Sequence, residues 1–213
     1  MDHPFPASPT ETSDAEYARL IEDLTVRHRF KDALRRLMAA GMLATPALRR
    51  GLRHDDPDVR VGCCIVLDHF MDEAAVPELI ENLGHGNPRV RSNALHALAC
   101  DRCKEGACRP GEDDVIPIAI RLLLGDESRS VRKTAAHMLT PAVHKREDVR
   151  RALEQARDHD PDRLVRKVAG WAAPGGPIYR RLAPKPVRKT REVVQADRLS
   201  KRALVAAADQ AAT

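Results

Sequence analysis

The stretch Asp56-Pro57-Asp58-Val59-Arg60 decides the fold, because it returns three times further along the chain. The valines at its centre are separated by steps of 31, 41 and 34 residues. A period of this length indicates a stack of repeated helical units. The three copies are Asn87-Pro88-Arg89-Val90-Arg91, Ser128-Arg129-Ser130-Val131-Arg132 and Asp162-Arg163-Leu164-Val165-Arg166.

Each copy has the features of a helix start. Its first residue, Asp, Asn or Ser, carries a side-chain acceptor suited to a helix N-cap, and Pro57 and Pro88 suit the first helical position. A small residue follows each valine by four positions, and in the first three copies a large one follows by eight, which gives one apolar face of a helix. The small residues are Cys63, Ala94, Ala135 and Ala169, and the large ones are Leu67, Leu98 and Leu139.

A second landmark shares the period. We interpret it as the start of a shorter helix that follows each first one and pairs with it, and Pro46 and Pro77 are again 31 residues apart. Together the two landmarks predict an all-α protein, an α-solenoid of about four to five helical hairpins. The copies are Thr45-Pro46-Ala47-Leu48, Val76-Pro77-Glu78-Leu79, Ile116-Pro117-Ile118-Ala119 and, with the proline lost, Glu147-Asp148-Val149-Arg150.

These features resemble the HEAT repeat family of armadillo-like helical proteins, in its short bacterial form similar to the phycobilisome-lyase type. The resemblance covers roughly Asp14 to Ala173 and rests on the Asp-Pro-x-Val-Arg start, the small residue after it and the proline of the other helix. It implies a ladder in which one arginine per repeat pairs with a neighbouring acid; the alternative is that these are solvated arginines. The arginine ladder would comprise Arg60, Arg91, Arg132 and Arg166.

We expect three regions. Residues 1–13 form a flexible N-terminus, residues 14–173 form the solenoid, and residues 174–213 form a basic, partly disordered tail in which a helix over 191–207 would also fit the pattern. Helices over 15–24 and 29–40 would make a degenerate first repeat that caps the stack.

Composition narrows the functional class. Apolar residues make up 43% of the chain and aromatics only 3%, which suits closely packed helices. Neither a signal peptide nor a membrane span is apparent, so we expect a cytoplasmic protein with no membrane partner and with cysteines that are reduced or bound to metal. From residue 178 onward there are nine basic and three acidic side chains, so the tail carries +6 and the body is nearly neutral.

One insertion interrupts the repeats. The step of 41 is ten residues longer than the first step of 31, and we place the excess at 100–112, between paired helices. Its spacing Cys-x2-Cys-x4-Cys would let thiolates hold zinc, which takes four ligands in a structural site. Free thiols in an ordered loop and a redox pair Cys100–Cys103 are the alternatives. The candidate ligands are Cys100, Cys103 and Cys108, with His96 or His69 as the fourth.

Four equivalent positions form what we call the histidine column: Ile65, His96, His137 and Trp171. The column could be a binding ridge or a pair of ligands. It could equally consist of boundary residues whose ring nitrogens are satisfied within the fold.

The sequence favours a non-catalytic scaffold that mediates protein–protein interaction. We find no nucleophile elbow, phosphate-binding glycine loop or His-Glu-x-x-His, and also no His-Glu dipeptide, the pair that holds iron in HEAT-repeat deoxyhypusine hydroxylases. The alternative is nucleic-acid binding through the tail, with a DNA-glycosylase-like enzyme less favoured; the tail could also merely aid solubility. The basic residues that would contact an anionic partner are Arg180, Arg181, Lys185, Arg188, Lys189 and Arg191.

Overall fold

The computed structural model describes residues 11–99, 112–184 and 195. Contacts between residues divide the chain into a larger unit, Met1–Leu182, and a smaller one, Ala183–Thr213. The expected helix over 191–207 lies outside the described residues except for Gln195, which is helical. The larger unit therefore carries the whole of the architecture discussed below.

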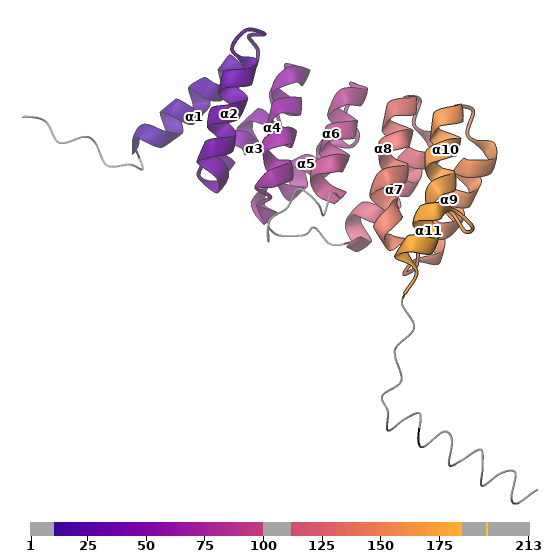
Figure 1. Cartoon of the computed structure of the whole chain (residues 1–213). Coiled ribbons are helices and arrows are strands. Elements are labelled where there is room, and N and C mark those ends of the chain that lie inside the picture. The colour runs from indigo at the N-terminus through magenta and orange to yellow at the C-terminus, as the bar shows by residue number, and fades with distance from the viewer. Residues whose placement is uncertain (1–10, 100–111, 185–194, 196–213) are drawn as a thin grey trace, which may run out of the picture. The chain divides into compact units, whose positions relative to one another are not determined.

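The described residues of the larger unit form helices and no strands. They stack side by side in chain order (Figure 1). The α-helices are α1 (Glu11–Asp23), α2 (Phe30–Ala40), α3 (Thr45–Gly51), α4 (Pro57–His69), α5 (Val76–Asn82), α6 (Pro88–Ala99), α7 (Glu112–Gly125), α8 (Arg129–Leu139), α9 (Glu147–His159), α10 (Arg163–Ala172) and α11 (Pro177–Leu182), and the 3-10 turns are η1 (Gly41–Ala44), η2 (Glu73–Ala75) and η3 (Thr140–Ala142).

The helices pair as α3 with α4, α5 with α6, α7 with α8 and α9 with α10, while α4, α6, α8 and α10 pack on one another as one layer. This pairing differs from the predicted one, in which the proline-marked helix forms a hairpin with the helix before it. The turn inside each observed hairpin is short and accepts hydrogen bonds from the following arginine, such as Arg60 to His54 O. The insertion consequently falls between two hairpins and not within one.

The predicted N-caps form in three of the four repeats. Asp56 accepts a hydrogen bond from Asp58 N, Asn87 from Arg89 N, and Asp162 from both Leu164 N and Val165 N. Ser128 makes no such bond, although its backbone has the extended conformation of a cap. The Asp126 carboxylate accepts from Ser128 N at 2.8 Å, a contact to the cap residue itself that His54, His85 and Asp160 make in the other repeats.

One predicted helix start is wrong. Helix α7 begins at Glu112, and Pro117 lies inside it. Pro46 and Pro77, in contrast, occupy the first turn of α3 and α5, as predicted. Proline is tolerated in a helix interior at a cost, since it lacks the N–H of the ladder and crowds the preceding turn.

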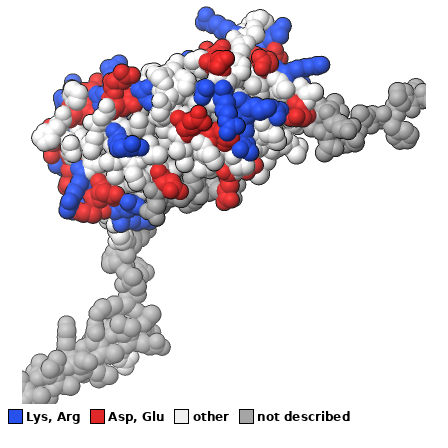
Figure 2. All heavy atoms as spheres, turned by 180° about the vertical axis from the view of Figure 1, so that it is seen from behind, with Lys and Arg blue, Asp and Glu red and all other residues white. Residues whose placement is uncertain are grey.

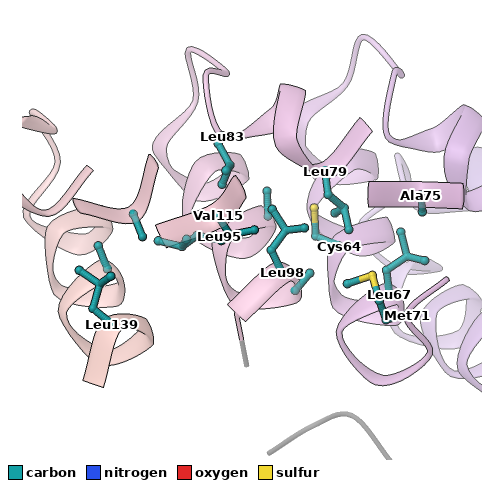
Figure 3. Close-up of a cluster of buried hydrophobic side chains, with 14 of the residues drawn as sticks. Cys64, Leu67, Met71, Ala75, Leu79, Leu83, Leu95, Leu98, Val115 and Leu139 are labelled. Carbon is teal, nitrogen blue, oxygen red and sulfur yellow. The ribbon is translucent and has the colours of Figure 1, made fainter. Parts of the chain in front are cut away.

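The core consists of the repeated apolar columns. Figure 3 shows how Cys64, Leu67, Leu79, Leu95 and Leu98 interleave between successive helices, and each of them is almost fully buried. The predicted columns behave in the same way, with every member at most 3% exposed. They are Val59, Val90, Val131 and Val165; Cys63, Ala94, Ala135 and Ala169; and Leu67, Leu98 and Leu139.

Close packing inside the α3/α4 hairpin depends on a glycine. A Cβ atom built on Gly51 would lie 2.4 Å from Cys63 Sγ, well inside van der Waals contact. Helix α1 adds Leu20, helix α2 adds Leu37, and the turn between them adds Leu24 to the same core. No described helix has the length and apolarity to cross a membrane.

A short helix follows the last hairpin, within the range that the sequence assigned to the tail. Gly175 makes the turn before it, with φ of 84° in the left-handed region that favours glycine. Helix α11 then packs against α10, and Tyr179 anchors it. His144 Nε2 donates to Tyr179 O at 2.8 Å, and the two rings lie 4.2 Å apart.

Candidate functional site

The arginine ladder joins neighbouring hairpins. Arg91 donates from Nε and Nη2 to the two carboxylate oxygens of Asp126, at 2.8 and 2.7 Å. Arg132 makes the same bidentate contact with Asp160, at 2.8 and 3.1 Å. Each guanidinium also donates to carbonyls of the turn before its own helix, for example Arg91 to His85 O and Arg132 to Asp126 O.

The side chains of these two pairs are almost completely excluded from solvent. The side chains of Arg91 and Arg132 are 9% and 10% exposed, and those of Asp126 and Asp160 are 4% exposed. Hydrogen bonds to the carboxylates raise the pKa of both arginines further above its already high value, against the opposing effect of burial. The charges of Arg91 and Arg132 are therefore compensated within the fold and are not available to a ligand.

The other two ladder arginines make no such contact with a carboxylate of the described residues. Arg60 donates to Asn82 Oδ1 at 2.9 Å and to Leu52 O at 2.8 Å. Arg166 follows the last turn of the ladder and donates to Asp160 O at 2.7 Å and to Pro161 O. The acids of the ladder could have been located from the sequence, because Asp126 and Asp160 each precede a ladder arginine by six residues.

A second buried carboxylate, Glu78 of α5, escaped the sequence reasoning. Its side chain is fully buried, and Oε1 accepts from Arg49 Nη2 at 2.8 Å and lies 2.8 Å from Arg53 Nη2. Burial favours the neutral acid, but the hydrogen bond from Arg49 and the charges of both arginines hold the pKa of Glu78 below its usual value. Glu78 thus links α3 to α5 as an ion pair.

The structure describes two of the five predicted metal ligands, His96 and His69. Cys100, Cys103 and Cys108 lie outside the described residues. His96 on α6 is described, and its Nδ1 lies 3.1 Å from Oδ2 of the buried Asp68 on α4. His69 is exposed and stacks loosely on Phe70, so the neighbour that meets His96 is Asp68. The described residues contain no group of three or more His, Cys, Asp or Glu able to hold a metal.

The histidine column borders a cavity of about 480 Å³. His96 and His137 lie in its wall, whereas Trp171 lies on α10 with the ammonium of Lys167 5.3 Å from its ring centre. Both histidines take part in further interactions within the molecule. The whole described lining is His96, Ala99, Thr134, His137, Met138, Thr140, Pro141, Ile178, Arg181 and Leu182.

The cysteines outside the insertion are packing residues. Cys63 and Cys64 are completely buried and form no disulfide. Burial raises the pKa of Cys63 well above that of an ordinary thiol and raises that of Cys64 to about 12. Neither side chain can supply a thiolate near neutral pH.

Charge on the surface is mixed. On the face seen from behind, Lys and Arg side chains alternate with Asp and Glu (Figure 2). Many of them are paired, as Arg89 is with Asp58. Of the basic residues predicted to contact an anionic partner, Arg180 and Arg181 lie on α11 and are exposed. Lys185, Arg188, Lys189 and Arg191 lie outside the described residues.

Comparison with known families agrees with this architecture. The family model for HEAT repeats matches residues 45–110 and 102–173, which together exceed half of the chain. The first match begins at Thr45, the first residue of α3, in the phase that the structure shows. A search of curated proteins finds no significant match. With two matched segments and four hairpins in register, the chain belongs to the HEAT repeat family.

Proposed function

We propose that the protein is a non-catalytic scaffold that binds another protein along the layer formed by α4, α6, α8 and α10. The observation that carries this proposal is the histidine column, which places Ile65, His96, His137 and Trp171 at equivalent positions of four adjacent helices. The layer presents aromatic, apolar and polar side chains there without an acidic residue among the four. The centre of a protein interface is typically depleted of charge in this way and enriched in aromatic groups.

The rest of the described surface supports the same choice of face. The other layer carries exposed ion pairs, such as those of Glu147 with Arg150 and Arg151 on α9, whereas the pairs Arg89–Asp58 and Arg129–Asp162 of the proposed layer lie at the helix starts. Exposed pairs of this kind add little to affinity and are typical of solvated surface. Repeat arrays use extended surfaces for recognition, and their binding energy is distributed over several repeats.

Site-specific photo-crosslinking tests this proposal. A photoreactive phenylalanine at His137 should give a discrete adduct in extracts of the source cells, and one at Arg121, exposed on α7 in the other layer, should not. The protein in the adduct is then purified and titrated against the unmodified chain and against Trp171→Ala, which we expect to bind at least about tenfold more weakly. Equal crosslinking from both positions, or equal affinity of both chains, would contradict the proposed face.

A structural metal in the insertion is a second proposal, and the contact of His96 with Asp68 favours it. Histidines that ligate metals usually have their other ring nitrogen bonded to a carboxylate, which fixes the tautomer and the ring orientation. His96 would then join Cys100, Cys103 and Cys108 to complete the four ligands of a closed zinc site. A zinc content near one per chain in protein purified without chelator would support this, and a content near zero would contradict it.

Nucleic-acid binding through the tail is the alternative to the scaffold. It rests on the +6 charge beyond residue 177 and not on the body, whose described surface is mixed in sign. The structure sharpens its test, because α11 belongs to the larger unit and must be retained. Salt-dependent retention on DNA should be strongly reduced in a chain that ends at Ala183, which keeps Arg180 and Arg181 but none of the later basic residues. Undiminished retention of that shortened chain, or none of the full chain at low salt, would contradict the tail hypothesis.

A further inference from the structure

The cavity beside the histidine column has the properties of a small-molecule site. Its volume of about 480 Å³ falls within the range of roughly 300–1,000 Å³ that is usual for ligand pockets. It lies where three helices and a turn converge: α6, α8, η3 and α11. Ligand sites are concentrated at such junctions, where a concave surface is lined by apolar groups and a few polar ones.

Contacts on all sides hold the walls in place. Thr134 of α8 and Ser92 of α6 share a hydrogen bond of 2.8 Å, and Asp68 orients His96 from behind. The α11 wall is fixed by the contact of Tyr179 with His144. Because contacts within the protein fix these walls, binding requires little ordering of the protein.

The lining distinguishes between classes of ligand. Met138, Ile178 and Leu182 supply an apolar surface for a hydrocarbon body. The described lining contains no carboxylate, and the guanidinium of Arg181 at its edge makes no ion pair with a described residue. An apolar wall next to an available cation complements a molecule with an apolar body and an anionic head.

The helix ends near the cavity act against an anion, but weakly. The carbonyl ends of α6 and α8 carry partial negative charge, which falls off within the last turn. The 3-10 turn partly neutralises it, because Thr140 N–H donates to His137 O at the end of α8. The full positive charge of Arg181 therefore determines the sign at the mouth of the cavity.

We propose that this cavity binds a small amphipathic organic anion, with the carboxylate or equivalent group at Arg181 and the hydrocarbon part against Met138, Ile178 and Leu182. The cavity adjoins the protein-binding face proposed above, since His96 and His137 belong to both, but the ligand proposal does not depend on that face. It gives the scaffold a ligand site between the α5/α6 and α7/α8 hairpins and the terminal helix.

Methyl NMR of the full chain labelled at its methionines tests the proposal, with octanoate as the probe. Octanoate should shift the Met138 methyl signal saturably, with a dissociation constant at or below about 1 mM, and leave the signal of the exposed, distant Met42 unchanged. The Met138 signal is identified by its loss in Met138→Leu. Octan-1-ol, which has the same chain without the charge, should bind about fivefold more weakly.

Two matched variants on one helix isolate the head group. Arg181→Glu should weaken octanoate binding by about fivefold or more without changing the octan-1-ol affinity, whereas Arg180→Glu, also exposed on α11, should change both by less than about twofold. Absence of a Met138 shift at about 10 mM octanoate, an equal shift at Met42, or equal effects of the two variants would each overturn the proposal.

Discussion

The joint between the α3/α4 and α5/α6 hairpins differs from the two joints that follow it. In the later joints a buried aspartate, Asp126 or Asp160, stands six residues before the next ladder arginine and receives the guanidinium of the previous repeat. At the corresponding place in the earlier joint stands His85, whose Nδ1 accepts from Asn87 N at 3.0 Å. Arg60 then turns to the neutral amide of Asn82.

The comparison shows that hydrogen bonding, and not net charge, is the shared requirement of the joints. In all three, the side chain before the turn caps a backbone N–H, and the arginine reaches across to an oxygen of the next hairpin. Asn82 satisfies this oxygen requirement while its own Nδ2 donates to Leu52 O and Glu78 O. We call the first joint neutral and the later two ionic after the group that receives the ladder arginine, although Glu78 of the first joint also pairs with Arg49.

The ionic joint should be the more sensitive to loss of a partner. We expect Asp126→Ala to lower the free energy of unfolding by about 3 kcal/mol, because it leaves the buried guanidinium of Arg91 without its counter-ion. Urea titration followed by circular dichroism measures this. Asp58→Ala removes an exposed carboxylate paired with Arg89 and should cost less than about 1 kcal/mol. Equal losses in the two variants would show that the Arg91–Asp126 pair is not special.

Removing a partner from the neutral joint should lower the free energy of unfolding by less, but still measurably. Asn82→Ala leaves Leu52 O and the Arg60 guanidinium short of partners in a buried site, and we expect a loss of about 2 kcal/mol. Asn93→Ala is the matched control, since Asn93 bonds only to Arg89 O of its own helix. The two variants are compared by thermal unfolding at one pH. If Asn93→Ala were as destabilising, the joint would contribute nothing of its own.

Converting the neutral joint to the ionic type sharpens the comparison. We expect His85→Asp to stay within about 1 kcal/mol of the wild type, because a buried ion pair roughly balances its own desolvation. If the new carboxylate takes over Arg60, Asn82→Ala should cost less in this background than in the wild type. Additive losses in the double-mutant cycle would mean that Arg60 does not switch partners.

The smallest effect concerns pH. Burial and the charges of Arg60 and Arg91 lower the pKa of His85. The unfolded chain then takes up a proton near pH 6.5 while the folded chain does not, so stability falls as the pH drops below about 6.5 and levels off once His85 is protonated in the fold. His85→Asn should show less of this loss between about pH 7.5 and 5.5 in chemical unfolding. The same pH dependence in both proteins would contradict the assignment to His85.

Much of the fold follows from the sequence because each repeat has its own local signals. Pro57 and Pro88 start helices where they were placed, and the columns of Val59 and Cys63 are buried throughout. The sequence did not determine whether each proline-marked helix pairs with the helix before it or the helix after it, since both pairings use the same helices in the same order. The start of α7 was also wrong, because Pro117 has the same sequence appearance inside a helix as at its first turn.

The candidate sites were less predictable, and for a different reason. The sequence offered His96 or His69 of the preceding repeat as the fourth metal ligand, but the residue of that repeat that contacts His96 is Asp68, next to His69. Successive side chains on a helix point about 100° apart. Aligning the repeats therefore predicts which helix a residue faces, but only to within one position which side chain it contacts. The cavity involves α11, whose position depends on the contact of Tyr179 with His144 across 35 residues. No periodicity could have indicated it.

The burial of the paired cysteines on α4 has a practical consequence for thiol chemistry. Reagents that alkylate cysteine attack the thiolate, and Cys63 and Cys64 are both inaccessible and fully protonated in the native state. Any rapidly labelled thiol in the folded chain therefore belongs to Cys100, Cys103 or Cys108. A time course of native labelling read by mass, with and without a chelator, reports on the insertion alone, and no cysteine of the core has to be removed first.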